Sequence, residues 1–338
     1  MFRLILLAAL APSFATANPL DLDPELDIDA SRGEVERPAA PIVNGKEETK
    51  WPQAIALGST QFGFSACSGS IIAPRVVLTA AHCGADFPLE LMLDFGEVIV
   101  GTSMGDVDHT LKAVDFKVHP DYRPLSGMDT GAYDIALFEL AEDAPVEPIW
   151  INTDPLKAKD VGKEVLSVGW GITGASGAGG GTKRSAPLIV DEIDEMFVLS
   201  VVSTNENNAN ICSGDSGGPQ YHFDEETGEW IQWAVHSWGD SNCLFNSGST
   251  RTDVAKKFIL DFVEDVHGTS DFCAIQGRYG DGVCDTNCDE TDIDCLLGDP
   301  ALFESLAGES EKGGCNQGGG PTWLWLGFAP LVFLRRGR

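Results

Sequence analysis

Short strand-like runs, separated by glycine and proline turns, fill the chain from residue 42 to about residue 253. None of them has the periodicity of an amphipathic helix. Examples are SGSIIAPRVVLT, EVIVG, LKAVDFKVH, DIALFEL, EVLSVGW and WIQWAVHSW. A chain with many short strands folds into a β-sandwich or a β-barrel, so we predict an all-β body.

One clear helix is predicted behind these strands, in the segment TDVAKKFILDFVEDVHG. Thr252 or Asp253 can cap its start, and Gly268 can cap its end. The apolar residues that fall on one helical face are Val254, Phe258, Phe262, Val263 and Val266.

Residues 1–17 are predicted to be a secretory signal peptide, because a basic Arg3 is followed by an apolar run and a small-residue cleavage site. A buried first strand is the alternative, but no charged residue interrupts the run before that site. Residues 18–41 are rich in acids and proline and poor in aromatics, so they cannot bury a core. We interpret them as a pro-segment ahead of Ile42.

Export places the chain in an oxidising compartment, where cysteines pair. Four of the nine cysteines are dispersed through the body, four lie within residues 273–295, and Cys315 stands alone. An odd cysteine in an exported protein needs its own explanation. The net charge of −30, from 52 acidic and 22 basic residues, repels phosphate backbones and argues against nucleic-acid binding.

Three motifs carry the residue types of nucleophilic catalysis: TAAHC with His82, YDIALFEL with Asp134, and GDSGGP with Ser216. A serine hydroxyl needs a histidine to take its proton, and a buried carboxylate to fix the tautomer of the imidazole. The glycines around Ser216 let the N–H groups of Gly214 and Ser216 converge as an oxyanion hole. We therefore predict a His-Asp-Ser triad.

These motifs, with IVNG, HPDY, GWG and SWG, give residues 42–268 a resemblance to trypsin/chymotrypsin-type serine endopeptidases. The resemblance implies two six-stranded antiparallel β-barrels with the triad in the cleft between them. A lone Gly-x-Ser-x-Gly motif would also suit an α/β-hydrolase, but the order of the triad and the strand-rich pattern argue against that fold. The resemblance also implies disulfides that join Cys67 to Cys83 and Cys212 to Cys243.

The same resemblance implies a specificity pocket with Asn210, six residues before the nucleophile, at its base. A neutral Asn210 cannot pair with arginine or lysine, Ile211 adds an apolar wall, and Gly239 and Gly248 leave the walls open. We expect a neutral, medium to large side chain before the scissile bond.

Substrate is expected to bind as an added strand. The residues that would hydrogen-bond its backbone are Ser237, Trp238 and Gly239.

In this family, cleavage before the isoleucine of IVNG frees an α-amine that pairs with the aspartate beside the nucleophile. Here these residues are Ile42 and Asp215, and a buried carboxylate at that place needs a cation. Pro41 precedes Ile42, and Pro38 follows Arg37, so a trypsin-like activator is disfavoured. We expect a separate, non-tryptic activating protease or trimming from an upstream cut.

The stretch FCAIQGRYGDGVCDTNCDETDIDC, residues 272–295, has too many cysteines and too few apolar residues for a core of its own. We predict a small module, residues 273–295, held by disulfides among Cys273, Cys284, Cys288 and Cys295. The stretch resembles a Notch-type repeat with fewer cysteines, which implies calcium binding. A solvated acidic knot without metal is the alternative. The candidate ligands are Asp281, Asp285, Asp289, Asp292 and Asp294.

Residues 296–314 are interpreted as a linker. The segment 315–338 contains Cys315, a glycine spacer, a short apolar run and trailing arginines. It resembles the C-terminal sorting tags of myxobacterial-type surface proteins, which implies processing and anchoring at Cys315. A plain tail anchor or an interfacial segment is the alternative.

Together these features predict a serine endopeptidase that is secreted or held at the cell surface, and that is made as a zymogen. Its expected partners are protein or peptide substrates and an activating protease, with attachment to a membrane or cell surface through the C-terminal segment. Catalysis needs no cofactor, and calcium is expected only in the cysteine-rich module. The alternative is a binding or adhesion protein on an inactive protease scaffold, but the complete triad and the oxyanion glycines favour the enzyme.

Overall fold

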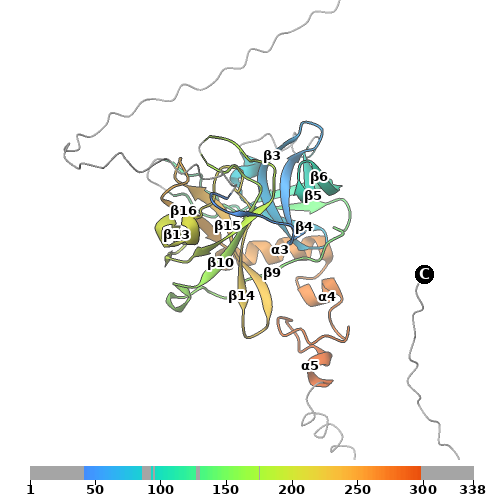
Figure 1. The fold of residues 1–338 in the computed structure, drawn as a ribbon. Coiled ribbons are helices and arrows are strands. Elements are labelled where there is room, and N and C mark those ends of the chain that lie inside the picture. Colours follow the sequence, from blue (N-terminus) through green and yellow to red (C-terminus); the bar gives the residue numbers. More distant parts are fainter. Residues whose placement is uncertain (1–41, 86–92, 94–95, 127–129, 175, 298–338) are drawn as a thin grey trace, which may run out of the picture. The chain divides into compact units, whose positions relative to one another are not determined.

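Two curled, largely antiparallel sheets form the body of the protein (Figure 1). The computed structural model describes residues 42–85, 93, 96–126, 130–174 and 176–297. The predicted signal peptide, the pro-segment and the segment that contains Cys315 lie outside these residues. No helix within the described ranges is both long and apolar enough to cross a membrane.

The first sheet has the strand order β6-β5-β2-β3-β4-β8-β7. Only Lys112 separates β6 from β7, although these strands lie at opposite edges of the sheet. The sheet is thus closed by one bent strand, which leaves few open edges. The strands are β2 (Ala54–Ser59), β3 (Phe64–Ala73), β4 (Val76–Thr79), β5 (Glu97–Ser103), β6 (Asp106–Leu111), β7 (Ala113–Val118) and β8 (Ala136–Leu140).

The second sheet has six long strands and three two-residue strands. The edge strand β12 follows closely on β11, which lies next to the other edge strand, β1, because Val190 and Asp191 alone separate β11 from β12. The long strands are β10 (Glu164–Gly169), β11 (Arg184–Ile189), β13 (Phe197–Val201), β14 (Pro219–Asp224), β15 (Glu229–Gly239) and β16 (Asn246–Arg251). The short ones are β1 (Lys46–Glu47), β9 (Trp150–Ile151), which runs parallel to β15, and β12 (Glu192–Ile193). With β6 and β7 counted as one bent strand, the prediction of two six-stranded barrels is confirmed.

A continuous hydrophobic core lies between the sheets and α3 (Lys256–His267). Both sheets contribute to it, with residues such as Leu78 and Phe138 from the first and Val235 from the second. The residues of α3 that reach the core are Ile259, Phe262 and Val263. Burial of these side chains, each of which is worth about 1.5–3 kcal/mol, holds the helix against the strands.

The helix begins later than predicted. Thr252 donates its hydroxyl to the carbonyl of Asn152 at 2.8 Å, and Asp253 accepts hydrogen bonds from Arg251. Neither residue is therefore free to cap α3, so the predicted start was wrong, and a 3-10 turn precedes the helix instead. Gly268, with a φ of 78°, ends the helix as predicted.

The remaining elements are short. The helices are α1 (His82–Ala85), α4 (Phe272–Gln276) and α5 (Ile293–Leu297). The 3-10 turns are η1 (Ala158–Asp160), η2 (Val202–Thr204), η3 (Glu206–Asn208) and η4 (Asp253–Ala255).

The cysteine-rich segment after α3 contacts the body through Arg278. The guanidinium lies 4.7 Å from the ring centre of Trp150 and donates hydrogen bonds to Asp285 at 2.9 Å and to Glu147 at 2.5 Å. Two disulfides cross the segment, Cys273–Cys288 and Cys284–Cys295. Because the Asp285 side chain is only 2% exposed, Arg278 is its counter-charge in a poorly solvated place.

We predict that Arg278→Met lowers the free energy of unfolding by about 3 kcal/mol, because it leaves the buried Asp285 carboxylate without its cation. The matched control is Lys257→Met, which removes the exposed ion pair with Asp261 and should cost less than about 0.5 kcal/mol. Urea unfolding followed by tryptophan fluorescence measures both. Equal losses in the two variants would contradict the role of Arg278.

Candidate active site

Asp134 lies just before β8 and is the centre of a hydrogen-bond network that joins the two sheets. Its Oδ1 accepts the backbone N–H of His82 at 2.9 Å. Its Oδ2 lies 2.7 Å from His82 Nδ1 and accepts the Ser237 hydroxyl at 2.6 Å. Because Oδ2 is an acceptor, we assign the proton of the imidazole to Nδ1, which leaves Nε2 as the acceptor. Asp134 is only 6% exposed, so this carboxylate is held in one place.

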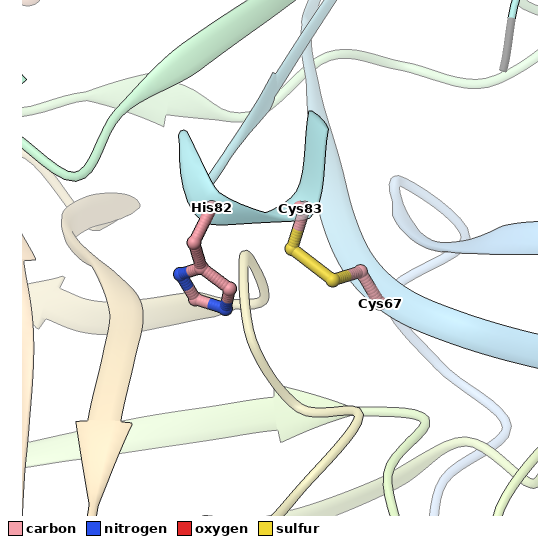
Figure 2. A group of neighbouring side chains, drawn as sticks. All are labelled: Cys67, His82 and Cys83. Carbon is pink, nitrogen blue, oxygen red and sulfur yellow. A yellow bond between two sulfur atoms is a disulfide. The ribbon is translucent and has the colours of Figure 1, made fainter. Parts of the chain in front are cut away.

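His82 opens α1, directly after β4, and a disulfide fixes its neighbour. Figure 2 shows His82 and Cys83 side by side on α1, with Cys83 joined to Cys67 of β3. The sulfur atoms and an imidazole nitrogen lie within 4.8 Å of one another, which is close enough for a metal site. Both sulfurs are consumed by the disulfide, however, so no thiolate remains to bind a metal. The disulfide therefore fixes the backbone next to His82.

The loop that carries Ser216 is attached to the first sheet by Ser68 of β3. The backbone N–H of Ser68 donates to the carbonyl of Ser216 at 2.8 Å, and its hydroxyl donates to the carbonyl of Gly214 at 2.9 Å. The same hydroxyl accepts the N–H of Trp170 at 2.9 Å. Ser68 thus joins the loop before β14 to the sheet that positions His82.

Gly217 allows the Ser216 loop to approach the first sheet. Its φ of 82° is left-handed, and a Cβ there would lie 2.1 Å from Thr79 Oγ1 and 2.3 Å from the carbonyl oxygen of Ser68. No side chain fits that space, and L-residues rarely adopt that backbone. A glycine after Ser216 is therefore a requirement of the packing between the sheets.

The backbone around Ser216 presents two N–H donors. Gly214 has a φ of 91°, which turns the peptide before Asp215. Within the described residues, no backbone hydrogen bond uses the N–H of Gly214 or of Ser216, whereas the N–H groups of Asp215, Gly217 and Gly218 are all bonded. Two N–H donors without a backbone acceptor, close in sequence to a hydroxyl, are the groups that an oxyanion hole requires.

A cavity of about 410 Å³ brings the predicted residues together. His82 and Asp134 from the first sheet and Ser216 from the second all line it. Other lining residues include Ile211, Cys212, Ser213, Ser237, Trp238, Gly239, Asp240 and Cys243. Asn210 and Gly248 do not line it.

The part of the chain that holds this cavity matches a known family. Residues 42–259 match the family model described as Trypsin. The chain belongs to the trypsin family.

Two curated relatives have a similar sequence. Spermosin of Halocynthia roretzi is 28% identical over 264 residues, which cover 71% of this chain and 64% of spermosin. Serine protease Hayan of Drosophila melanogaster is 29% identical over 251 residues, which cover 64% of this chain and 37% of Hayan. The chain thus spans less than two thirds of either relative.

The strand register of the trypsin-family domain decides which residue faces Gly239. In the β15–β16 pair, Gly239 lies opposite Ser247, and Trp238 lies opposite Gly248. A Cβ on Gly248 would come within 2.4 Å of the Trp238 ring, so Gly248 provides room for this indole. Ser247, rather than Gly248, is thus the residue across from Gly239. The sequence did not indicate it, because the loop before β16 leaves the register open.

Asp215 is fully buried beside Ser216. Its Oδ1 accepts the N–H of Gly171 and its Oδ2 accepts the N–H of Cys212, both at 2.8 Å. Burial raises the pKa of Asp215 to about 7, although these two hydrogen bonds act in the opposite direction. The uncut domain thus holds a carboxylate for which ionisation is unfavourable.

Ile42 is also fully buried, and it packs among the apolar residues of the second sheet. Its φ is 35°, in the left-handed region that a β-branched side chain avoids. Such a backbone costs on the order of 1–3 kcal/mol. The φ angle of Ile42 exists only while its nitrogen is bonded to the carbonyl carbon of Pro41. Hydrolysis of the Pro41–Ile42 peptide bond would therefore remove this constraint.

His236 is buried directly behind the nucleophile loop. Its backbone N–H donates to Gly218 and its carbonyl accepts from Gly217, both at 2.8 Å. Its Nδ1 lies 3.1 Å from the hydroxyl of Ser249. Burial lowers the pKa of His236 to about 3, so the imidazole is neutral at physiological pH.

Four of the five candidate ligands in the cysteine-rich segment accept hydrogen bonds from backbone amides or from Arg278, namely Asp281, Asp285, Asp292 and Asp294. Asp292 accepts the N–H groups of Gly280 and Asp285, and Asp294 accepts the N–H of Gly282. Among the described residues, the cluster of Cys67, His82 and Cys83 is the one group with metal-like spacing. The described carboxylates do not form a ready cation cage, and calcium binding stays a prediction of the sequence.

We predict that His236 makes the domain sensitive to acid. Its pKa is lower in the folded state, so its contribution to stability is complete above the unfolded pKa and is lost as pH falls toward 3. Between pH 7 and pH 4.5 the free energy of unfolding should fall on the order of 2–3 kcal/mol more in the wild type than in His236→Val.

Urea unfolding at a series of pH values measures this difference. The control is His109→Val, because His109 is exposed on β6 and loses little solvation on folding. Its pH profile should follow that of the wild type. An identical profile for His236→Val would show that burial of this imidazole is not the cause.

Proposed function

We propose that this chain is a serine endopeptidase that hydrolyses peptide bonds in proteins, with Ser216 as nucleophile, His82 as general base and Asp134 as the group that orients it. The observation that carries the proposal is the Asp134 network. One buried carboxylate holds His82 by Nδ1 and by its backbone, within the cavity that Ser216 also lines. With Nδ1 held by Asp134, Nε2 of His82 is the nitrogen that we propose as the base.

The proposed reaction has two halves. Ser216 Oγ attacks the carbonyl carbon while Nε2 of His82 takes its proton, and the N–H groups of Gly214 and Ser216 stabilise the oxyanion. The C–N bond then breaks as His82 returns the proton to the leaving amine, which gives an acyl-enzyme. In the second half water replaces the amine, His82 again accepts the proton, and the ester bond to Ser216 breaks.

Substrate is proposed to bind as an extra strand beside residues 237–239. Pairing of β14 with β15 begins at Pro219 and Val235, so within the described strands Trp238 and Gly239 pair only with β16, and Ser237 lies at a shift of the register. Their other side is open toward the cavity, which Ser237, Trp238 and Gly239 line. An extended polypeptide can add there through its backbone. We further propose that the residue before the cut is neutral, because Asn210 carries no charge.

The enzyme is proposed to be made as a zymogen that is cut before Ile42. Two properties of the uncut domain support this proposal: the left-handed backbone at Ile42 and the unfavourable ionisation of Asp215. A cut before Ile42 would relieve both. An N-terminal residue has no φ angle to constrain, and its α-amine is a cation that can pair with the Asp215 carboxylate. Pro41 before the cut disfavours a tryptic activator.

Export is proposed from the signal-like first 17 residues and from the disulfides. Four disulfides form in the described residues, two in the trypsin-family domain and two behind it. Such bonds persist in oxidising compartments.

We predict that a fluorophosphonate probe labels Ser216 in the cut enzyme, and that Ser216→Ala removes labelling and lowers kcat/KM by about 10⁴-fold or more. Mass spectrometry of the labelled peptide locates the site. Labelling that persists in Ser216→Ala would contradict the assignment of the nucleophile. A cut wild type that neither labels nor hydrolyses peptides would instead support an inactive binding protein on this scaffold.

We predict that Asp215→Asn lowers the activity of the cut enzyme by about 100-fold or more and changes the uncut chain little, because only the cut form has the ion pair. Pairing raises the pKa of the α-amine, so its contribution is complete below the unfolded pKa and is lost as pH rises through the folded one. Activity of the wild type should therefore fall on the alkaline side.

The pH profile of kcat/KM measures this loss. The control is Asp160→Asn, a buried carboxylate paired with Lys163, which should keep the alkaline fall. Full activity of the cut Asp215→Asn enzyme would contradict the activation mechanism.

A further inference from the structure

Two buried side chains behind the cavity have polar atoms without partners. Neither Nδ2 nor Oδ1 of Asn210 has a hydrogen bond within the described part of the chain, and the same holds for Oγ of Ser247. Asn210 is 0% exposed and Ser247 is 1% exposed. Buried polar groups in proteins are nearly always bonded, because burial without a partner is costly. These two residues therefore need an explanation.

Neither residue lines the cavity itself, but each lies next to a residue that does. Asn210 immediately precedes Ile211, which lines the cavity, and Ser247 lies opposite Gly239, which also lines it. A Cβ on Gly239 would lie 3.8 Å from Ser247 Cβ and 3.8 Å from the carbonyl oxygen of Ile211. Since Gly239 has no side chain, this corner of the cavity is left open to a substrate side chain.

The chemistry of this corner is neutral and can both donate and accept. The amide of Asn210 offers two donors and an acceptor, and the hydroxyl of Ser247 offers one of each. The nearby carboxylate of Asp240 is already used, since it accepts the N–H groups of Asn242, Leu244 and Phe245. No charged group among these residues is available to compensate a charged ligand.

We propose that Asn210 and Ser247 together form the floor of the pocket that takes the side chain before the scissile bond, and that they select glutamine or asparagine. This inference rests on the proposed endopeptidase activity. A side-chain amide donates to Oδ1 of Asn210 or Oγ of Ser247 and accepts from Nδ2 of Asn210. An apolar side chain leaves these atoms unpaired, and a site built to hydrogen-bond rejects such analogues strongly. A carboxylate or an ammonium group enters without a counter-ion.

The experiment uses enzyme cut before Ile42 and fluorogenic peptides that differ only in the residue before the cut. Glutamine is compared with methionine, and asparagine with leucine, because each pair has a similar size. Glutamate and lysine test the charged alternatives. We expect kcat/KM for the amide of each pair to exceed that of its apolar partner by about tenfold or more. A higher kcat/KM for the methionine, glutamate or lysine peptide than for the glutamine peptide would overturn the proposal.

Variants test the residues themselves. Ser247→Ala should lower the glutamine-to-methionine ratio by about tenfold. Ser167→Ala is the matched control, because Ser167 is also a buried serine without a partner in the described residues. It lies on β10 opposite Ala186 and Gln220, neither of which lines the cavity. Its ratio should stay as in the wild type. An unchanged ratio in active Ser247→Ala would overturn the role of Ser247.

A second variant keeps the proposal testable if Ser247→Ala does not fold. Asn210→Asp places a charge at the same floor and should raise the ratio of lysine to glutamine cleavage by about tenfold or more. Fluorophosphonate labelling reports whether each variant has an intact nucleophile. Labelled enzyme with a different preference overturns the pocket assignment alone. Wild-type enzyme that neither labels nor cleaves any peptide overturns the proposed function and this inference with it.

Discussion

The Asp134 carboxylate is the interaction on which the arrangement of the site depends. It comes from the first sheet, but one of its oxygens is bonded both to His82 and to Ser237 of the second sheet. A change in the distance between the sheets would break one of these bonds. The orientation of the imidazole is therefore coupled to the packing of the two sheets, which Ser68 and Gly217 also hold in close contact around Ser216.

A second constraint is the buried carboxylate of Asp215. In the uncut chain it has two backbone donors, and its pKa is raised to about 7 by burial. A site next to Ser216 thus contains a group whose charge the fold does not fully compensate. The left-handed backbone of Ile42 packs among apolar residues of the second sheet. In the proposed activation, hydrolysis of one bond would relieve this strain and supply the missing charge. This combination gives a physical reason for the proposed cut before Ile42.

Much of this was predictable from local sequence. The motifs around His82, Asp134 and Ser216 predicted three residues that the fold does bring to one cavity. The strand pattern predicted an all-β body, and the resemblance to the family implied the two barrels. The resemblance to the family implied the disulfides Cys67–Cys83 and Cys212–Cys243, which are present.

Other features depend on tertiary structure. The place of Ser247 follows from the β15–β16 register, which is set by a loop that folds around Asp240. The start of α3 depends on the contacts of Thr252 and Asp253 with distant residues. Four cysteines allow three pairings, so the bonds of the cysteine-rich segment could not be derived from spacing. The hydroxyl of Ser237 was expected near substrate, and its bond to Asp134 has no sequence signal.

The central claim is that the site is latent until the chain is cut before Ile42. N-terminal sequencing of the protein captured by a fluorophosphonate probe tests it most directly, because the probe selects active molecules. The account predicts that the captured protein begins Ile42-Val43-Asn44-Gly45. A captured protein of full activity that begins at any other residue would contradict it.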